Sequence, residues 1–144
     1  MGAVRFGAKA VAALLLLLIL ILAALRVGAY LREDGAPPPP GTRMAATPYG
    51  AVAIGLSGPP AGRPVMLVHA TAAWRGFWKD VAGHLARRGW RVIAVDLPPF
   101  GWSGHDAAAR YGRPVQAERL AAVLAAVAGE PAVVVGHSFG AGPA

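Results

Sequence analysis

The sequence predicts an α/β fold in which a parallel sheet is flanked by helices. Three short apolar runs, residues 65–69, 92–96 and 132–135, alternate with two helical patterns at 77–88 and 115–128. Apolar runs bounded by turn residues are typical of strands that are buried on both faces of a parallel sheet. Strands that alternate with helices indicate right-handed crossover connections. The fold class follows from this alternation alone.

An apolar segment precedes the folded part. Residues 10–25 are apolar throughout, Arg26 interrupts the run, and further apolar residues follow. Residues 10–31 together are long enough to cross the hydrocarbon of a bilayer, with the Arg26 guanidinium reaching the interface. A secretory signal peptide is the rival interpretation, with a small-residue cleavage site at residues 27–29. Arg26 beside that site and the length of the apolar run favour a retained anchor.

The anchor divides the chain into four parts. We predict a short basic tail (1–9), a transmembrane anchor (10–31), a proline-rich linker (32–43) and an incomplete catalytic domain (44–144). Four consecutive prolines in the linker favour polyproline II, which acts as a stiff spacer. The basic tail favours a cytoplasmic N-terminus, so we expect a single-pass membrane protein with its domain on the extracytoplasmic side. Basic residues at the other end of the anchor leave the positive-inside count open.

Charge and composition exclude several classes of function. The net charge of +7 comes from 14 Lys and Arg against 7 Asp and Glu, but the basic residues of the folded part are spread along the chain. A nucleic-acid-binding protein would cluster them on one face, so we interpret the arginines as solvated and expect no nucleic-acid partner. The chain has no cysteine, which excludes a disulfide framework and a thiolate metal site. We expect neither a metal nor an organic cofactor.

A G-x-S-x-G motif stands directly after the third apolar run. Residues 136–140 read Gly-His-Ser-Phe-Gly. In this motif the serine sits at a tight strand-to-helix turn, and glycines two residues to either side leave room for the strained backbone. The amides of the following helix favour the negative charge that develops during acyl transfer. The motif predicts Ser138 as a nucleophile; the alternative is a glycine-rich turn with an incidental serine.

With this motif the chain resembles the α/β-hydrolase superfamily over about residues 64–144. Residues 69–74 lie where the family carries its His-Gly oxyanion loop, with alanine where the family usually has glycine. Residues 96–103 match the family's Asp-x-Pro-x-x-Gly-x-Ser loop, and residues 136–140 match its nucleophile elbow. The three landmarks occur in the family's order.

The resemblance implies a role for each matched position. Ser138 is expected to be the nucleophile, flanked by the elbow glycines Gly136 and Gly140. The backbone N–H groups of Phe139 and Thr71 are expected to form the oxyanion hole.

The same resemblance implies that two histidines are structural. His69 and His137 are expected to support loops, and neither is expected to act as the general base.

The remaining triad residues are missing from the sequence. In this fold the order is Ser, then Asp or Glu, then His, and only six residues follow Ser138. Asp96, His105 and Asp106 precede Ser138 at the same sheet edge, where an improvised triad is the alternative. We expect the sequence to be partial and, without an acid and a base, nearly inactive.

These expectations define a serine hydrolase that acts on a small-molecule acyl or ester substrate through an acyl-enzyme. Serine at the elbow argues against haloalkane dehalogenases and epoxide hydrolases, which carry aspartate there in the family. Esterase, lipase, thioesterase, C–C bond hydrolase and cofactor-free haloperoxidase-like activities stay open. The alternatives from other classes are an acyltransferase on the same fold and a non-catalytic truncated remnant.

Overall fold

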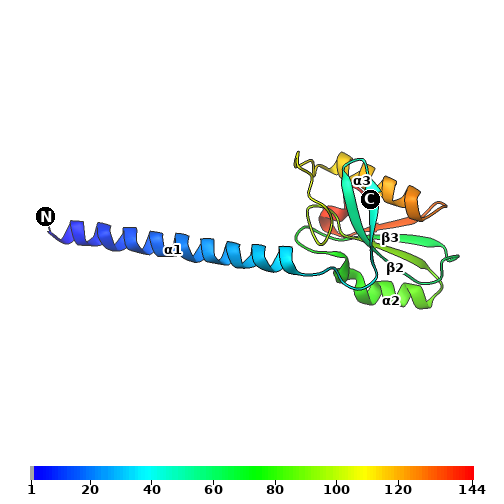
Figure 1. Cartoon of the computed structure of the whole chain (residues 1–144), viewed down its shortest axis with the longest axis horizontal. Helices are drawn as coiled ribbons and strands as arrows, with labels where there is room; N and C mark the ends of the chain where they lie inside the picture. The colour runs from blue at the N-terminus through cyan, green and yellow to red at the C-terminus, as the bar shows by residue number, and fades with distance from the viewer. Residues whose placement is uncertain (1) are drawn as a thin grey trace. The chain divides into compact units, whose positions relative to one another are not determined.

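The computed structural model describes residues 2–144, with the side chains of residues 9–31 and 36–144. The chain divides into two compact units, Met1–Pro37 and Pro38–Ala144. The first unit consists mainly of one helix, α1 (Gly2–Gly35), and the second contains all the strands (Figure 1).

Helix α1 carries the predicted membrane span. Its segment Lys9–Leu31, 23 residues long, is apolar enough to cross a membrane, and none of it is buried within the protein. Apolar side chains in such numbers are unfavourable in water and are accommodated by a bilayer. A signal sequence near the N-terminus meets the same criteria of length and composition, so both interpretations of the sequence apply to this helix.

The second unit is built on a five-stranded sheet with the order β1-β2-β4-β3-β5. The central strand β3 pairs in parallel with β4 on one side and with β5 on the other. The strands are β1 (Thr42–Thr47), β2 (Gly50–Ser57), β3 (Pro64–Val68), β4 (Arg91–Val95) and β5 (Val133–Gly136).

The expected parallel pairing is confirmed for β3, β4 and β5, and the sheet also contains β1 and β2, which are paired differently. Strand β2 is antiparallel to both β1 and β4, so the sheet is mixed. The connections explain the difference. Residues 48–49 alone join β1 to β2, and residues 58–63 join β2 to β3 without a helix. Antiparallel strands accept such short links, whereas parallel neighbours need a long crossover.

Helices cover both faces of the sheet. Helix α2 (Lys79–Arg87), preceded by the 3-10 turn η1 (Arg75–Trp78), lies on one face, and α3 (Arg113–Val127) lies on the other (Figure 1). Side chains of a strand alternate between the faces. On β3, Met66 and Val68 belong to the larger core cluster beneath α3, whereas Val65 and Leu67 pack toward α2.

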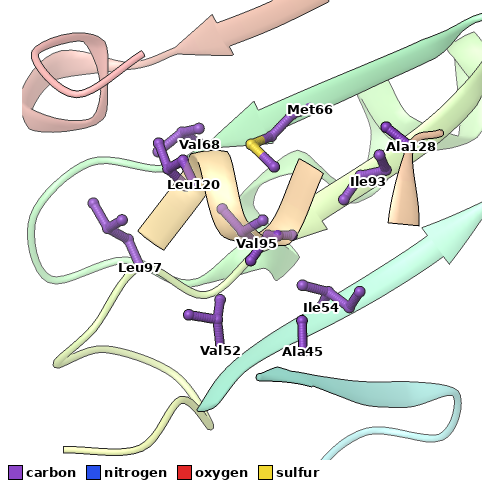
Figure 2. Close-up of a cluster of buried hydrophobic side chains, with 11 residues drawn as sticks. Ala45, Val52, Ile54, Met66, Val68, Ile93, Val95, Leu97, Leu120 and Ala128 are labelled. Carbon is purple, nitrogen blue, oxygen red and sulfur yellow. The ribbon is translucent and has the colours of Figure 1, made fainter. Parts of the chain in front are cut away.

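The larger core cluster joins strands β1 to β4 to α3 (Figure 2). Every residue of β3 is buried, which explains why this strand appears in the sequence as a continuous apolar run. The well-packed centre fixes the carboxyl ends of β3, β4 and β5 at one edge of the sheet. The loops that follow these three ends carry the predicted site residues, apart from Gly136, which is the last residue of β5.

Candidate active site

Ser138 lies in the turn that follows β5 and has a backbone φ of 53°. A positive φ is uncommon and strained for a residue with a side chain, and such strain is typical of functional sites. Ser138 is exposed and begins the 3-10 turn η2 (Ser138–Ala141), in which the Gly140 N–H donates to the His137 carbonyl over 3.0 Å. The chain therefore makes the sharp strand-to-helix turn that the motif predicts.

The two elbow glycines are required by close backbone packing. A Cβ atom added at Gly136 would come within 2.4 Å of the Gly140 carbonyl oxygen. A Cβ at Gly140 would come within 2.4 Å of the His69 carbonyl oxygen and 2.8 Å of that of Val68. Real Cβ atoms do not approach backbone oxygens so closely, so side chains at either position would force the elbow apart. The elbow is thus packed directly against the end of β3.

The predicted oxyanion loop lies beside the elbow, because β3 and β5 are neighbouring parallel strands. Val68, the last residue of β3, pairs with Gly136, and its carbonyl accepts a hydrogen bond from the His137 N–H over 3.0 Å. Thr71 and Phe139 each lie three residues beyond this pair. Within the described part of the chain, no residue accepts a hydrogen bond from the backbone N–H of either one.

In the turn that contains Thr71, the strained backbone conformation is that of Ala72. The Ala73 N–H donates to the Ala70 carbonyl over 3.3 Å, and Ala72 has a φ of 56°. A positive φ at the third residue is the signature of a type II turn, a position that favours glycine. Ala70 itself is not in the left-handed region, so the alanine that replaces the family's usual glycine there needs no unusual backbone conformation.

His69 is fully buried and uses both of its ring nitrogens. The Leu97 N–H donates to Nε2 over 2.8 Å, which leaves the proton on Nδ1 to be donated to the Ala70 carbonyl over 2.6 Å. Burial lowers the pKa of the His69 imidazole below its ordinary value. The neutral imidazole, with a hydrogen bond at each ring nitrogen, connects the loop after β3 to the loop after β4. This geometry fits the expected structural role.

The stability of the domain is expected to fall on acidification because of His69. The pKa of the folded imidazole is depressed below the ordinary value of 6.5, so the unfolded chain binds the proton first. The contribution of His69 is complete above pH 6.5 and is lost as the pH falls toward the folded pKa. Urea midpoints measured between about pH 7 and 5 should decline for the native chain and stay flatter for His69→Gln. Parallel curves for the two proteins would contradict this assignment.

The contacts of His137 are those of a structural residue and not of a general base. Its exposed imidazole stacks on Phe77 with ring centroids 5.0 Å apart and an interplanar angle of 17°, and Trp78 meets it edge-on at 6.5 Å. The ring thus belongs to an aromatic group on the α2 side of the sheet. This arrangement also fits the expected structural role.

Asp96 organises the third predicted landmark and is not free to act in a triad. Its buried carboxylate forms an ion pair with Arg75, accepts the Arg75 N–H over 2.7 Å and accepts the Trp102 N–H over 3.1 Å. Gly101 has a φ of 63°, and a Cβ there would come within 2.3 Å of the Asp96 carboxyl carbon. The Ser103 hydroxyl donates to the Asp96 carbonyl over 2.5 Å. The polar residues of the motif therefore hold one loop together.

Asp106 is also engaged by arginines. Its carboxylate accepts Arg110 Nε and Arg119 Nη2, each over 2.9 Å, and the hydrogen bond from Arg110 is the main cause that lowers the Asp106 pKa. Arg119 is fully buried and also donates to Gln116 Oε1 over 3.0 Å. His105 is exposed. Neither Asp96 nor Asp106 is available to orient a histidine for Ser138, which argues against the improvised triad.

The interpretation of all arginines as solvated is wrong for Arg75 and Arg119. Arg75 is 8% exposed and Arg119 is 0% exposed. The buried residues of α3 are Gln116, Arg119, Leu120 and Val123. Counted from Gln116 they lie three, four and seven residues along, which is the spacing of one helix face. This spacing is visible in the sequence and places Arg119 on the inner face. No comparable signal identifies Arg75, because its partner Asp96 is distant in the sequence.

In the described residues, no group of three His, Cys, Asp or Glu is placed to bind a metal ion.

Comparison with known proteins identifies the family. The model of the α/β-hydrolase fold family matches residues 63–144, more than half of the chain. The chain belongs to the α/β-hydrolase fold family. The match begins just before β3 and includes the loop after β3, the Asp96 loop and the elbow.

The relatives include hydrolases of several kinds. The 2-hydroxymuconate semialdehyde hydrolase of Pseudomonas sp. (strain CF600) is 41% identical over 86 residues, which is 57% of this chain and 30% of that protein. The 2-hydroxy-6-oxo-2,4-heptadienoate hydrolase of Pseudomonas putida is 37% identical over 84 residues, 56% of this chain and 30% of that protein. An esterase structure from Rhodococcus sp. ECU1013 has a TM-score of 0.63 and 32% identity, covering 69% of this chain and 37% of the esterase. The chain thus spans about a third of the length of these relatives.

Proposed function

We propose that the protein is a membrane-anchored serine hydrolase that acts on a small-molecule ester through an acyl-enzyme on Ser138. The observation that carries the proposal is the left-handed backbone of the exposed Ser138, held between two glycines that cannot bear side chains. Such strain costs on the order of 1–3 kcal/mol and is concentrated at functional sites, which supports a nucleophile over an incidental serine in a loop.

Stabilisation of the oxyanion is assigned to two backbone donors. The N–H groups of Thr71 and Phe139 follow neighbouring strand ends and have no acceptor among the described residues. Attack of Ser138 Oγ on the ester carbonyl forms the carbon–oxygen bond and moves negative charge onto the carbonyl oxygen. Loss of one such donor typically costs about 2.7–4 kcal/mol of transition-state stabilisation. The ester carbon–oxygen bond then breaks, and the alcohol leaves with the proton that the Ser138 hydroxyl gave up. Water next attacks the acyl-enzyme, which releases the acid and restores the Ser138 hydroxyl.

We propose that the general base and its orienting acid are residues other than His69, Asp96 and Asp106. His69 has both ring nitrogens bonded, and the carboxylates of Asp96 and Asp106 are held by arginines. This fold orders its triad as Ser, acid, His along the chain, so we infer that both groups follow Ser138. Without them the serine is expected to retain only the residual acceleration that the oxyanion hole and binding supply.

Anchoring is assigned to α1. Its segment Lys9–Leu31 is long and apolar enough to span the bilayer, and its side chains are not buried within the protein. We propose a single-pass protein with the hydrolase domain on the extracytoplasmic side. Resistance to alkaline carbonate extraction is the expected behaviour, whereas loss of α1 from the mature protein would identify it as a signal sequence.

A second candidate reaction is hydrolysis at a carbon–carbon bond beside a ketone. It is favoured by the 41% and 37% identity to two hydrolases whose names describe oxo-dienoate or semialdehyde substrates. The same serine and oxyanion donors would serve there, because the electrophile is again a carbonyl carbon.

Pre-steady-state kinetics on the full-length enzyme tests the proposal. With an excess of a p-nitrophenyl ester, we expect a burst of about one nitrophenolate per active site, followed by slower turnover, because acylation precedes deacylation. Turnover of a 2-hydroxy-6-oxo-dienoate with no ester burst would favour the second candidate. Absence of both reactions in a folded, full-length enzyme would contradict the assigned function.

A further inference from the structure

We propose that one surface of the hydrolase domain docks on the bilayer beside the anchor. This interfacial patch consists of Met44, Trp74, Lys79 and Trp102. The proposal rests on the membrane anchoring by α1 proposed above. Docking would turn the Ser138 edge of the sheet toward the membrane and so define the substrate as an ester that partitions into lipid.

The connection between anchor and domain is short. Four helical residues separate the apolar span, which ends at Leu31, from the end of α1 at Gly35, and residues 36–41 then lead to Thr42 at the start of β1. At about 1.5 Å per helical residue and about 3.1 Å per residue of polyproline, the four steps from Leu31 to Gly35 and the seven from Gly35 to Thr42 span about 28 Å. The headgroup region occupies about 5–7 Å of that distance. The linker therefore keeps Thr42 within reach of the lipid surface.

The patch surrounds this point of entry. Thr42 contacts the Arg75 guanidinium through its hydroxyl, and its N–H donates to the Pro39 carbonyl over 3.1 Å. The same guanidinium lies 5.8 Å from the ring centroid of Trp74 and 5.5 Å from that of Trp102. The two indoles meet edge to face at 5.0 Å. A single buried arginine thus joins the end of the linker to both tryptophans.

The chemistry of the patch suits an interface between lipid and water. Trp74 is 40% exposed and Met44 is 53% exposed. Met44 lies two residues along β1 from Thr42 and hence on the same face of the sheet. Tryptophan is enriched at membrane interfaces, and lysine can bury its stem while its ammonium meets lipid phosphate. Lys79 is exposed beside this apolar surface.

An apolar hollow adjoins the patch. It has a volume of about 340 Å³ and opens between β2 and the start of α2, with Trp74 and Lys79 in its wall. A Cβ at Gly76 would come within 2.3 Å of the Trp74 ring, so this glycine leaves the space that the indole occupies. An acyl chain fits a hollow of this composition, because most of its exposed lining is apolar.

The patch and Ser138 share one edge of the sheet. Trp74 belongs to the loop after β3 and Trp102 to the loop after β4, and Ser138 follows β5, the other parallel neighbour of β3. Contact of the two tryptophans with the bilayer brings this carboxyl edge toward the lipid. A substrate dissolved in the membrane then reaches Ser138 without crossing bulk water.

The absence of cysteine allows a direct test with single fluorescent labels. The full chain is placed in nanodiscs of equal parts phosphatidylcholine and phosphatidylglycerol that contain a headgroup-linked quencher. One label is attached at Ala46→Cys, on the exposed part of β1 near the patch, and another at Ala61→Cys, in the exposed loop at the opposite edge. Quenching is compared for the native surface, for Trp74→Ser with Lys79→Gln, and for a control, Val81→Ser with Arg87→Gln. The control removes one exposed apolar and one exposed basic side chain elsewhere.

We expect stronger quenching at position 46 than at position 61. The patch variant should lower the docking equilibrium constant roughly tenfold or more, as expected for removal of a large apolar side chain from a buried position. The control should change it little. Equal quenching at both positions, or equal effects of the two variants, would overturn the docking surface. Stronger quenching at position 61 would do so too, by placing the opposite edge on the lipid. Failure of anchoring is a separate result, because the chain would then elute apart from the nanodiscs whatever its labels report.

Discussion

Replacement of Ser138 by alanine is expected to abolish ester turnover by the full-length enzyme. The substitution removes the nucleophile and leaves the oxyanion donors in place. In serine proteases the loss of the nucleophile lowers kcat by about 10⁶-fold, and the remaining rate comes from the oxyanion hole and binding. The measurement is steady-state hydrolysis of a p-nitrophenyl ester together with covalent labelling by a fluorophosphonate. Both signals should vanish in Ser138→Ala.

Ser57→Ala is the matched control. Ser57 is an exposed serine at the end of β2, at the opposite edge of the sheet from the elbow. This variant should label and turn over like the native enzyme. Undiminished labelling of Ser138→Ala would show that another residue reacts and would refute the assigned nucleophile.

Replacement of Arg75 by methionine is expected to produce the largest loss of stability. Asp96 is 0% exposed and Arg75 is 8% exposed, and the guanidinium is the only cation paired with Asp96 among the described residues. Removal of one partner leaves a buried carboxylate with two backbone N–H donors and no counter-ion. Breaking a buried ion pair in this way costs about 3–5 kcal/mol. Urea unfolding of the full chain in detergent should show a corresponding fall in the midpoint.

A control and a second variant separate charge from packing in this experiment. Arg63→Met removes an exposed arginine that lies 5.4 Å above the Trp90 ring, and it should cost less than about 1 kcal/mol. Arg75→Met combined with Asp96→Asn should recover part of the loss, because no charge is then buried alone. A double variant no more stable than Arg75→Met would show that the arginine acts through packing, and would contradict the electrostatic explanation.

The sequence was most informative where one physical requirement acts on consecutive residues. The run that became β3 is apolar throughout because both of its faces are covered. The elbow was recognisable because steric crowding demands glycine at two fixed positions around Ser138. These features are local, and their signal survives in a single sequence. Family membership follows from the same residues and is confirmed by the family model.

Features that depend on distant partners were not predictable in the same way. Arg75 contacts Asp96, 21 residues away, and the sequence near either residue does not indicate that the two form an ion pair. The antiparallel pairing of β2 with β4 depends on which strand of the sheet β2 joins, and its own sequence of small and apolar residues does not specify the neighbour. The strained turn at Ala72 carries alanine where glycine would have given a local signal.

Mass spectrometry of the protein isolated from its natural source after treatment with a fluorophosphonate decides whether Ser138 is a nucleophile. We expect one covalent adduct, on the peptide that contains Ser138. A folded protein that carries no adduct, or an adduct on another residue alone, would contradict this assignment and leave a non-catalytic member of the fold.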